Sequence, residues 1–391
     1  MPLRICLNSL PEQQLWARVR HKTCLSCWGC TPQAVIRLAI RLRQLAQGAS
    51  FMTARKISVF STCPQSKNET PQDYLNRVRT IAQWSERYGC RGILVYADNS
   101  LVDPWLVSQQ ILQHTTELCP MVAVQPMYMH PYAAAKMVAS LGHMYNRRIF
   151  LNMIAGGFRN DLTALNDDTP HDDRYVRLTE YTQIIRHLLS SERGVTFEGS
   201  YYHIRNLKMT PALAPELFPG IMMSGSSPAG AAAAAAAGAI AVKYPQRACD
   251  ELQSSQELAG PSGIRVGIIA RETTEAAWQV AHARFPTDRK GQVMHRVAMN
   301  VSDSHWHKQL SEMARESAVA DDPYWLGPFE NYRTFCPYLV GSYERVAHEL
   351  SRYMGIGHDT FILDIPASEE ELLHTNVVFQ EATNSHMSAS A

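Results

Sequence analysis

From Ile57 onward the chain alternates short apolar runs rich in β-branched residues with segments of helical periodicity, and no other feature of the sequence constrains the fold as strongly. Strands that alternate with helices form parallel sheets, because each helix carries the chain back to the end from which the next strand starts. The predicted strands cover residues 57–62, 92–96, 121–125, 149–153, 220–224, 239–244, 265–271 and 360–364. Eight strand–helix units predict an α/β fold, a (β/α)8 TIM barrel with insertions.

One long stretch, residues 286–338, interrupts this alternation. A structureless loop of that length is uncommon inside a compact domain, so we expect it to carry helices of its own or to act as a mobile lid. The predicted barrel domain is 52–381, and the last residues, 382–391, are predicted to form a disordered tail.

The first 51 residues differ from the rest in charge. They hold seven Arg and Lys and a single acid, Glu12, which leaves the remaining chain net acidic by about five charges. Cys24, Cys27 and Cys30 are spaced as CxxCxxC, but structural zinc needs four ligands and no second cluster follows, so we predict no metal site. An Arg-rich, acid-poor start is also typical of a transit peptide, although this one lacks much of the usual serine. The simplest interpretation of residues 1–51 is a basic extension that is dispensable for the fold.

Composition excludes several classes of function. A formal net charge of +1 argues against a general nucleic-acid binder. No apolar run approaches the ~18 residues that a membrane span requires. Nine cysteines, an odd number in a long chain without a convincing secretory signal, argue against a disulfide framework. We therefore expect a reduced, cytoplasmic protein.

Polar residues follow the predicted strands at the barrel end that usually holds the chemistry. The run Ser224-Gly225-Ser226-Ser227 opens a helix, where it can bind a phosphate or simply cap the helix, and the local pattern does not decide between them. Asn152 stands at the tip of the fourth strand. Arg174 and Tyr175 can bind an anion, although locally the sequence around them is better explained as an acid-rich helix start.

Taken together, these segments resemble the luciferase-like flavin-dependent monooxygenases, and most closely their alkanesulfonate monooxygenase branch. The resemblance spans 57 to about 379 and rests on RGILVYADNSLVDPWLV (91–107), RIFLNMIAGG (148–157), HDDRYVRLTEY (171–181), VTFEGSYYHIRNLKM (195–209), MSGSSPAG (223–230), IRVGIIARETTEAAWQVA (264–281), LVGSYERVAHEL (339–350) and GIGHDTFILD (355–364).

The resemblance implies a bacterial luciferase-like TIM barrel that binds reduced FMN and inserts one oxygen atom from O2 into a small organic molecule. It also implies a separate NAD(P)H:flavin reductase as partner and a homodimer or homotetramer. The flavin-binding positions that it implies are Tyr96, Ala97, Asn152, Asp161, Arg174, Tyr175, Ser226 and Ser227.

The positions at which this chain departs from the alkanesulfonate monooxygenases are ones that the resemblance assigns to substrate binding. Leu101 replaces a cysteine after the second strand and Gly267 replaces a histidine on the seventh, whereas Arg265 is retained and Arg333 falls near the family's mobile-loop arginine. The flavin site is therefore kept, while the set that handles a sulfonate is incomplete. We expect a substrate other than a simple alkanesulfonate.

Three residues are candidates for catalysis: Arg265, Arg333 and His130. Arg265 can balance an anionic reduced flavin, hold an acidic substrate, or form a structural ion pair. His130 is a candidate acid or base, or equally a surface loop residue. Two competing functions stay open: a deazaflavin F420-dependent oxidoreductase of the same fold, and a barrel that binds flavin without turnover.

Overall fold

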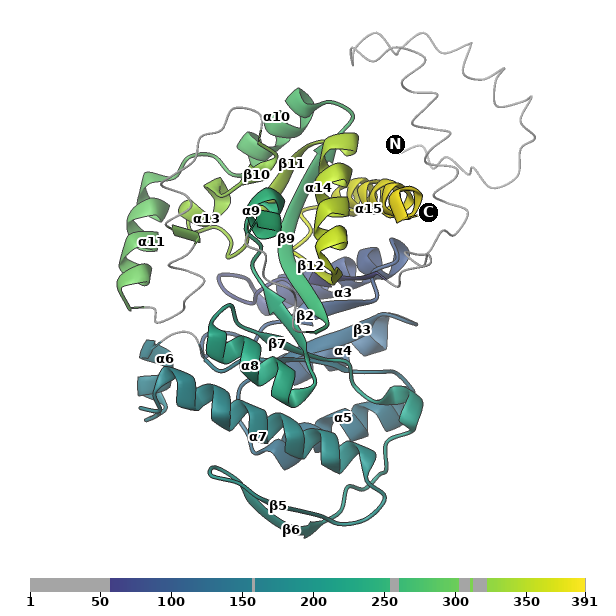
Figure 1. Cartoon of the computed structure of the whole chain (residues 1–391), viewed down its shortest axis with the longest axis vertical. Helices are drawn as coiled ribbons and strands as arrows, with labels where there is room; N and C mark the ends of the chain where they lie inside the picture. Colours follow the sequence, from purple (N-terminus) through teal and green to yellow (C-terminus); the bar gives the residue numbers. More distant parts are fainter. Residues whose placement is uncertain (1–56, 157–158, 254–259, 302–309, 312–321, 391) are drawn as a thin grey trace, which may run out of the picture. The chain divides into compact units, whose positions relative to one another are not determined.

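The computed structural model describes residues 57–156, 159–253, 260–301, 310–311 and 322–390. The chain divides into two compact units, Met1–Ser50 and Phe51–Ala391. The CxxCxxC cysteines, and with them the predicted extension, lie outside the described residues. All of the described residues belong to the second unit (Figure 1).

A closed ring of parallel strands forms the centre of this unit. Each strand pairs with its neighbour around the ring, and the last strand, β12, pairs with β1 and closes it. The ring order is β1 (Ser58–Thr62), β2 (Gly92–Val95), β3 (Cys119–Val124), β4 (Phe150–Met153), β7 (Ile221–Ser224), β8 (Ile240–Lys243), β9 (Ser262–Arg271) and β12 (His358–Leu363). The predicted TIM barrel is confirmed, and each predicted strand matches one strand of the ring.

Helices surround the ring (Figure 1). They are α3 (Pro71–Arg87), α4 (Pro104–His114), α5 (Pro131–Tyr145), α7 (His171–Ser190), α8 (Pro228–Ala237), α9 (Ala248–Gln253), α10 (Thr274–Arg284), α14 (Tyr343–Ile356) and α15 (Glu369–Ser390). Local sequence explains their starts: Thr70 caps α3 by accepting a hydrogen bond from the Asp73 amide at 3.2 Å, and proline occupies the first turn. Ala233, Ala234 and Ala237 of α8 are buried, so the alanine-rich segment is a closely packed barrel helix.

Strand β9 is longer than the others and pairs with different strands along its length. Its residues 262–266 pair with β12, and residues 267–271 pair with β11 (Tyr338–Ser342), which also pairs antiparallel with β10 (Tyr324–Trp325). Tyr338 lies beside Gly267, where an added Cβ would come within 2.3 Å of the tyrosine ring. Only glycine fits there, and the aromatic ring occupies the space that a larger side chain at 267 would need.

The insertion carries secondary structure, as expected from its length. Its described part includes α11 (Arg289–Val301), β10 and α13 (Gly327–Glu330). Smaller elements elsewhere are α6 (Arg159–Ala164), a short η1 helix (Pro215–Leu217) and the predicted hairpin, β5 (Val195–Glu198) with β6 (His203–Leu207).

The chain end differs from the sequence prediction. Where the sequence predicts a disordered tail from Ala382, α15 continues to Ser390, with Ala382 fully buried and the Thr383 hydroxyl bonded to the Phe379 carbonyl at 2.6 Å. Small and polar residues suggest a tail, but the helix is still packed at Ala382 and Thr383. Among the described residues, no helix combines the length and the hydropathy needed to cross a bilayer.

Candidate active site

A cavity of about 880 Å³ opens at the carboxyl ends of the barrel strands. Tyr96 follows β2, Asn152 lies in β4, Ser224 ends β7 and Asp364 follows β12, and all four line it. This is the end at which TIM barrels hold their chemistry. The cavity is large enough for a cofactor together with part of a substrate.

One side of the cavity is the turn between β7 and α8. Ser227 caps the helix, since its Oγ accepts a hydrogen bond from the Gly230 amide at 3.1 Å. Ser226 Oγ is buried and has no hydrogen-bond partner among the residues that the structure describes. The sequence left a phosphate site and a helix cap as alternatives, and the structure gives the cap to Ser227, so the two serines of the turn differ in their hydrogen bonding.

Tyr175 packs closely against the same turn. A Cβ added to Gly225 would come within 2.4 Å of the Tyr175 hydroxyl oxygen, so the turn and the ring approach each other because residue 225 has no side chain. The ten-residue helix α8 presents the positive end of its dipole here. A hydroxyl, a phenol and a helix N-terminus thus converge at one place that suits a phosphate group.

Asn152 lies deeper in the barrel and is only 6% exposed. Its Oδ1 accepts a hydrogen bond from the Ser224 hydroxyl at 2.8 Å, which fixes the orientation of the carboxamide. The amide nitrogen is then the donor that Asn152 offers to a ligand.

Most of the residues singled out from the sequence line this one cavity, although they come from segments far apart in the chain: Tyr96, Ala97, Asn152, Asp161, Tyr175, Ser226, Ser227, Arg265 and Arg333. Burial and the nearby Asp98 carboxylate raise the pKa of Asp161 above its usual value. Arg333 forms an ion pair with Asp288 at 2.7 Å, and its side chain remains 58% exposed. Their roles toward a ligand remain predictions.

Arg174 and His130 are not among the described residues that line the cavity. Arg174 is buried in the first turn of α7. His130 is exposed, and its Nδ1 accepts a hydrogen bond from the Tyr132 amide at 3.2 Å, which caps α5. The exposure of His130 agrees with the alternative that the sequence left open, a surface loop residue, and the structure adds that it caps α5.

The opposite side of the cavity is charged and aromatic. The Arg265 guanidinium lies over the Tyr96 ring, 4.9 Å from its centre, and 5.9 Å from the centre of the Tyr244 ring. Nη1 donates a hydrogen bond to the Tyr244 hydroxyl at 3.3 Å, and Nη2 lies 3.7 Å from Asp364 Oδ1. Arg265 is 6% exposed.

Asp364 is held in place by two hydroxyl groups. Its Oδ2 accepts hydrogen bonds from Thr334 at 2.6 Å and from Tyr338 at 2.7 Å. Burial and, after it, the Asp364 charge raise the pKa of Tyr338 well above its usual value, so the phenol stays a proton donor. Sequence reasoning missed Asp364, although a carboxylate directly after the last barrel strand is a signal that points to the site. Thr334 and Tyr338 lie within or at the edge of the insertion, where no periodic pattern identifies them.

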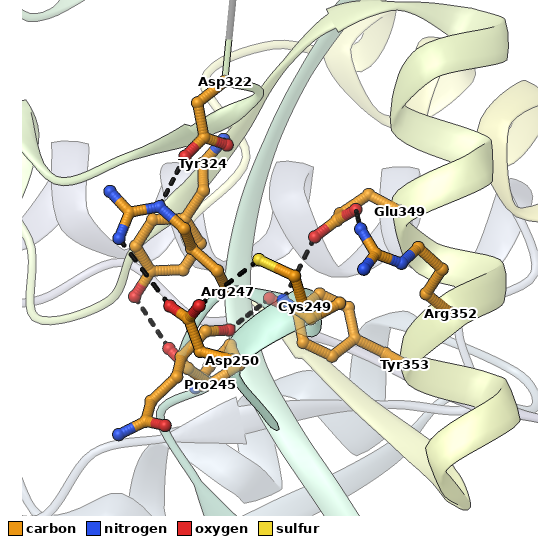
Figure 2. Close-up of polar contacts among 11 residues, drawn as sticks. Pro245, Arg247, Cys249, Asp250, Asp322, Tyr324, Glu349, Arg352 and Tyr353 are labelled. Carbon is orange, nitrogen blue, oxygen red and sulfur yellow. Dashed lines mark hydrogen bonds and ion pairs between the residues drawn. The ribbon is translucent and has the colours of Figure 1, made fainter. Parts of the chain in front are cut away.

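A polar cluster around the β8–α9 loop contacts the residues that follow Tyr244 (Figure 2). The Tyr324 hydroxyl donates to the Pro245 carbonyl at 2.7 Å, and Arg247 forms an ion pair with Asp322. On α14, Glu349 accepts a hydrogen bond from the Ala248 amide at 3.1 Å. The end of the insertion and α14 therefore fix the loop that carries Tyr244.

The match to known proteins agrees with this geometry. The family model described as luciferase-like monooxygenase matches residues 55–360. The chain belongs to this family. A curated relative from Niallia circulans is 38% identical over 321 residues, which cover 80% of this chain and 93% of the relative. That relative is the 4-(gamma-L-glutamylamino)butanoyl-[BtrI acyl-carrier protein] monooxygenase BtrO.

Solved structures share the fold of this luciferase-like monooxygenase. The EDTA monooxygenase EmoA from Chelativorans sp. BNC1 superposes with a TM-score of 0.64 at 15% identity, over 84% of this chain and 94% of that one. An F420-dependent secondary alcohol dehydrogenase superposes with a TM-score of 0.58 at 16% identity, over 84% of this chain and 99% of that one. At such low identity the superpositions establish the fold alone.

Proposed function

We propose that this chain is the oxygenase component of a two-component system that uses reduced FMN and O2 to oxygenate an organic substrate. The observation that carries the proposal is the buried Ser226 hydroxyl, which has no partner among the described residues and belongs to the turn before α8 that Tyr175 packs against. A separate NAD(P)H:flavin reductase supplies the reduced flavin.

The cavity fits FMN in size and in the polarity of its lining. Ser226, Tyr175 and the α8 N-terminus hold the phosphate, and Asn152 donates to the polar edge of the ring system. When bound, reduced FMN supplies the electrons that activate O2. Tyr332 and Phe335 of the insertion line the cavity. We expect their rings to restrict the access of water to the bound flavin, which such chemistry requires.

The substrate class is proposed from the relative BtrO and from two positions at which this chain departs from the alkanesulfonate monooxygenases. BtrO acts on an acyl group borne by the acyl-carrier protein BtrI. In this chain the Tyr338 ring fills the place beside Gly267, and Leu101 lines the cavity in place of a thiol. We therefore propose an acyl group tethered to a carrier protein as the substrate.

Mass spectrometry tests the function directly. Reduced FMN, O2 and the 4-(γ-L-glutamylamino)butanoyl thioester of BtrI are incubated with the chain, and we expect the acyl group to gain one oxygen atom from labelled O2. A native chain that binds reduced F420 tightly and does not bind reduced FMN would instead support the F420-dependent reaction. A chain that binds FMN and oxygenates neither this thioester nor other acyl thioesters would support the barrel without turnover.

A further inference from the structure

Arg265 and Asp364 lie side by side in the cavity, and each keeps bonding capacity that the protein does not use. We propose that they form a subsite for the zwitterionic end of an α-amino-acid group at the far end of the substrate. The inference rests on the proposed function for the acyl chain that carries this group.

Arg265 supplies the half of the subsite that binds a carboxylate. Its Nε and Nη2 are buried and have no hydrogen-bond partner among the described residues, and only Nη1 is bonded, to Tyr244. Leaving charged donors unsatisfied in the interior is costly. Nε and Nη2 are adjacent donors on one edge of the planar guanidinium, the edge that a carboxylate binds with two parallel hydrogen bonds.

Asp364 supplies the half that binds an ammonium group. Thr334 and Tyr338 both donate to Oδ2, so the carboxylate is held firmly through one oxygen. The other oxygen, Oδ1, lies 3.7 Å from Arg265 Nη2, which is too far for a hydrogen bond. A donor with positive charge on the ligand therefore finds an acceptor there.

The balance of charge selects a zwitterion over a simple anion. Arg265 and Asp364 together are neutral, and a carboxylate that approaches Arg265 also approaches the negative Asp364 at short range. A ligand that brings an ammonium group beside its carboxylate removes this repulsion. An α-amino acid carries both groups on one carbon, which matches the closeness of Nη2 and Oδ1.

The location separates this subsite from the proposed flavin site. Arg265 belongs to β9 and Asp364 follows β12, whereas Asn152 and the Ser224–Ser227 turn belong to β4 and β7. In the ring order, β12 stands opposite β4. When the amino-acid end of the substrate enters the cavity before the rest, it can contact Arg265 and Asp364. The thioester then stays toward the opening of the cavity.

Binding of small probes tests the subsite without flavin or turnover. We would measure by calorimetry the affinity of the full chain for γ-L-glutamylethylamide, for N-ethylglutaramate, which lacks the ammonium group, and for 4-amino-N-ethylbutanamide, which lacks the carboxylate. We expect the first to bind at least tenfold more tightly than either analogue. Equal affinities for the three probes, or no binding of the first, would overturn the proposal.

Two substitutions and a matched control assign the two halves. Asp364→Asn should remove the preference for γ-L-glutamylethylamide over N-ethylglutaramate. Arg265→Lys should reduce the preference for γ-L-glutamylethylamide over 4-amino-N-ethylbutanamide. The control is Glu371→Gln. Glu371 forms an ion pair with Arg271, which lies on the same strand as Arg265, and neither residue of this pair lines the cavity. The substitution should therefore leave all three affinities unchanged. A preference for the zwitterion that survives Asp364→Asn would refute the assignment.

Titration of the same proteins with reduced FMN separates this inference from the proposed function. If Asp364→Asn binds reduced FMN as the native chain does and loses only the probe preference, both proposals gain support. If the native chain binds reduced FMN and shows no probe preference, the subsite alone is wrong. If the native chain binds the zwitterion and does not bind reduced FMN, the flavin proposal is wrong and the subsite stands.

Discussion

The two sides of the cavity are lined by different kinds of chemical groups. The side formed by β4, β7 and α8 uses neutral hydroxyl and amide groups, a glycine and a helix N-terminus. The side formed by β9 and β12 uses a buried arginine, a carboxylate and aromatic rings. Neutral donors around a helix end suit a phosphate-bearing cofactor, whereas a charged pair with unused donors suits a charged part of the substrate. The comparison predicts that changes on one side affect one ligand and spare the other.

The largest effect is expected on the charged side. Arg265→Gln should lower kcat/KM for the carrier-bound substrate about 100-fold, or about 3 kcal/mol, because a buried charged donor pair is lost. The dissociation constant of reduced FMN should change by less than about threefold. Steady-state turnover and anaerobic flavin titration measure the two quantities, and an equal loss in both would mean that the two sides do not act separately.

A matching test concerns the neutral side. Gly225→Ala should weaken reduced-FMN binding at least tenfold, or about 1.4 kcal/mol, since the new Cβ would lie 2.4 Å from the Tyr175 hydroxyl oxygen and force the turn to move. Gly355→Ala is the matched control, because no atom lies within 4 Å of its added Cβ. Flavin titration of both variants makes the comparison, and unchanged affinity in Gly225→Ala would show that the turn does not contact the cofactor.

Asp161 lines the cavity from α6, and the segment that joins α6 to α7 is held by a buried ion pair between Asp167 and Arg177, at 2.6 Å. Burial alone would raise the pKa of Asp167, but hydrogen bonds from Arg177 and Thr169 lower it from 3.8 to about 2. The ionised Asp167 therefore adds about 2 kcal/mol of stability above pH ~4, and this is lost as the pH falls toward 2.

Denaturant unfolding of Asp167→Asn tests that pair. The variant should be less stable than the native chain by about 2 kcal/mol at pH 6, and the difference should shrink below pH 4. A difference that stays constant down to pH 3 would mean that the charge of Asp167 is not the cause.

The smallest effect is expected at the start of the chain. A chain that begins at Met52 should fold and bind reduced FMN with the affinity of the full chain, because the predicted strands and every predicted ligand position lie after it. Circular dichroism and flavin titration check this. Loss of soluble protein would show that residues 1–51 contribute to the fold.

Local sequence patterns predicted one side of the cavity better than the other. Strand ends, Thr70 before Pro71 and the Ser224–Ser227 turn before a helix are signals within a few residues, and they located the barrel, its helices and the neutral side. The charged side depends on contacts between distant segments. Tyr338 reaches Asp364 from the strand that follows the insertion, and Tyr244 is fixed by contacts with the end of the insertion and α14.

His130 is a residue for which the sequence offered a catalytic role and the structure shows a helix cap. A histidine after a barrel strand suggested an acid or base, but the same position is the residue before Pro131 at the start of α5, where the ring caps the helix instead. Chain order alone does not distinguish a residue that faces the cavity from one that turns to the helix behind it.

The central claim is that the β7–α8 turn binds the phosphate of reduced FMN, and one measurement tests it most directly. Anaerobic titration with photoreduced FMN would compare the native chain, Ser226→Ala and, as control, Ser342→Ala, which removes a serine hydroxyl at the start of another helix, α14, away from the cavity. We predict that the native chain binds reduced FMN, that Ser226→Ala binds it more weakly by about 1–3 kcal/mol, and that Ser342→Ala binds it normally. Equal affinity in all three proteins would contradict the claim.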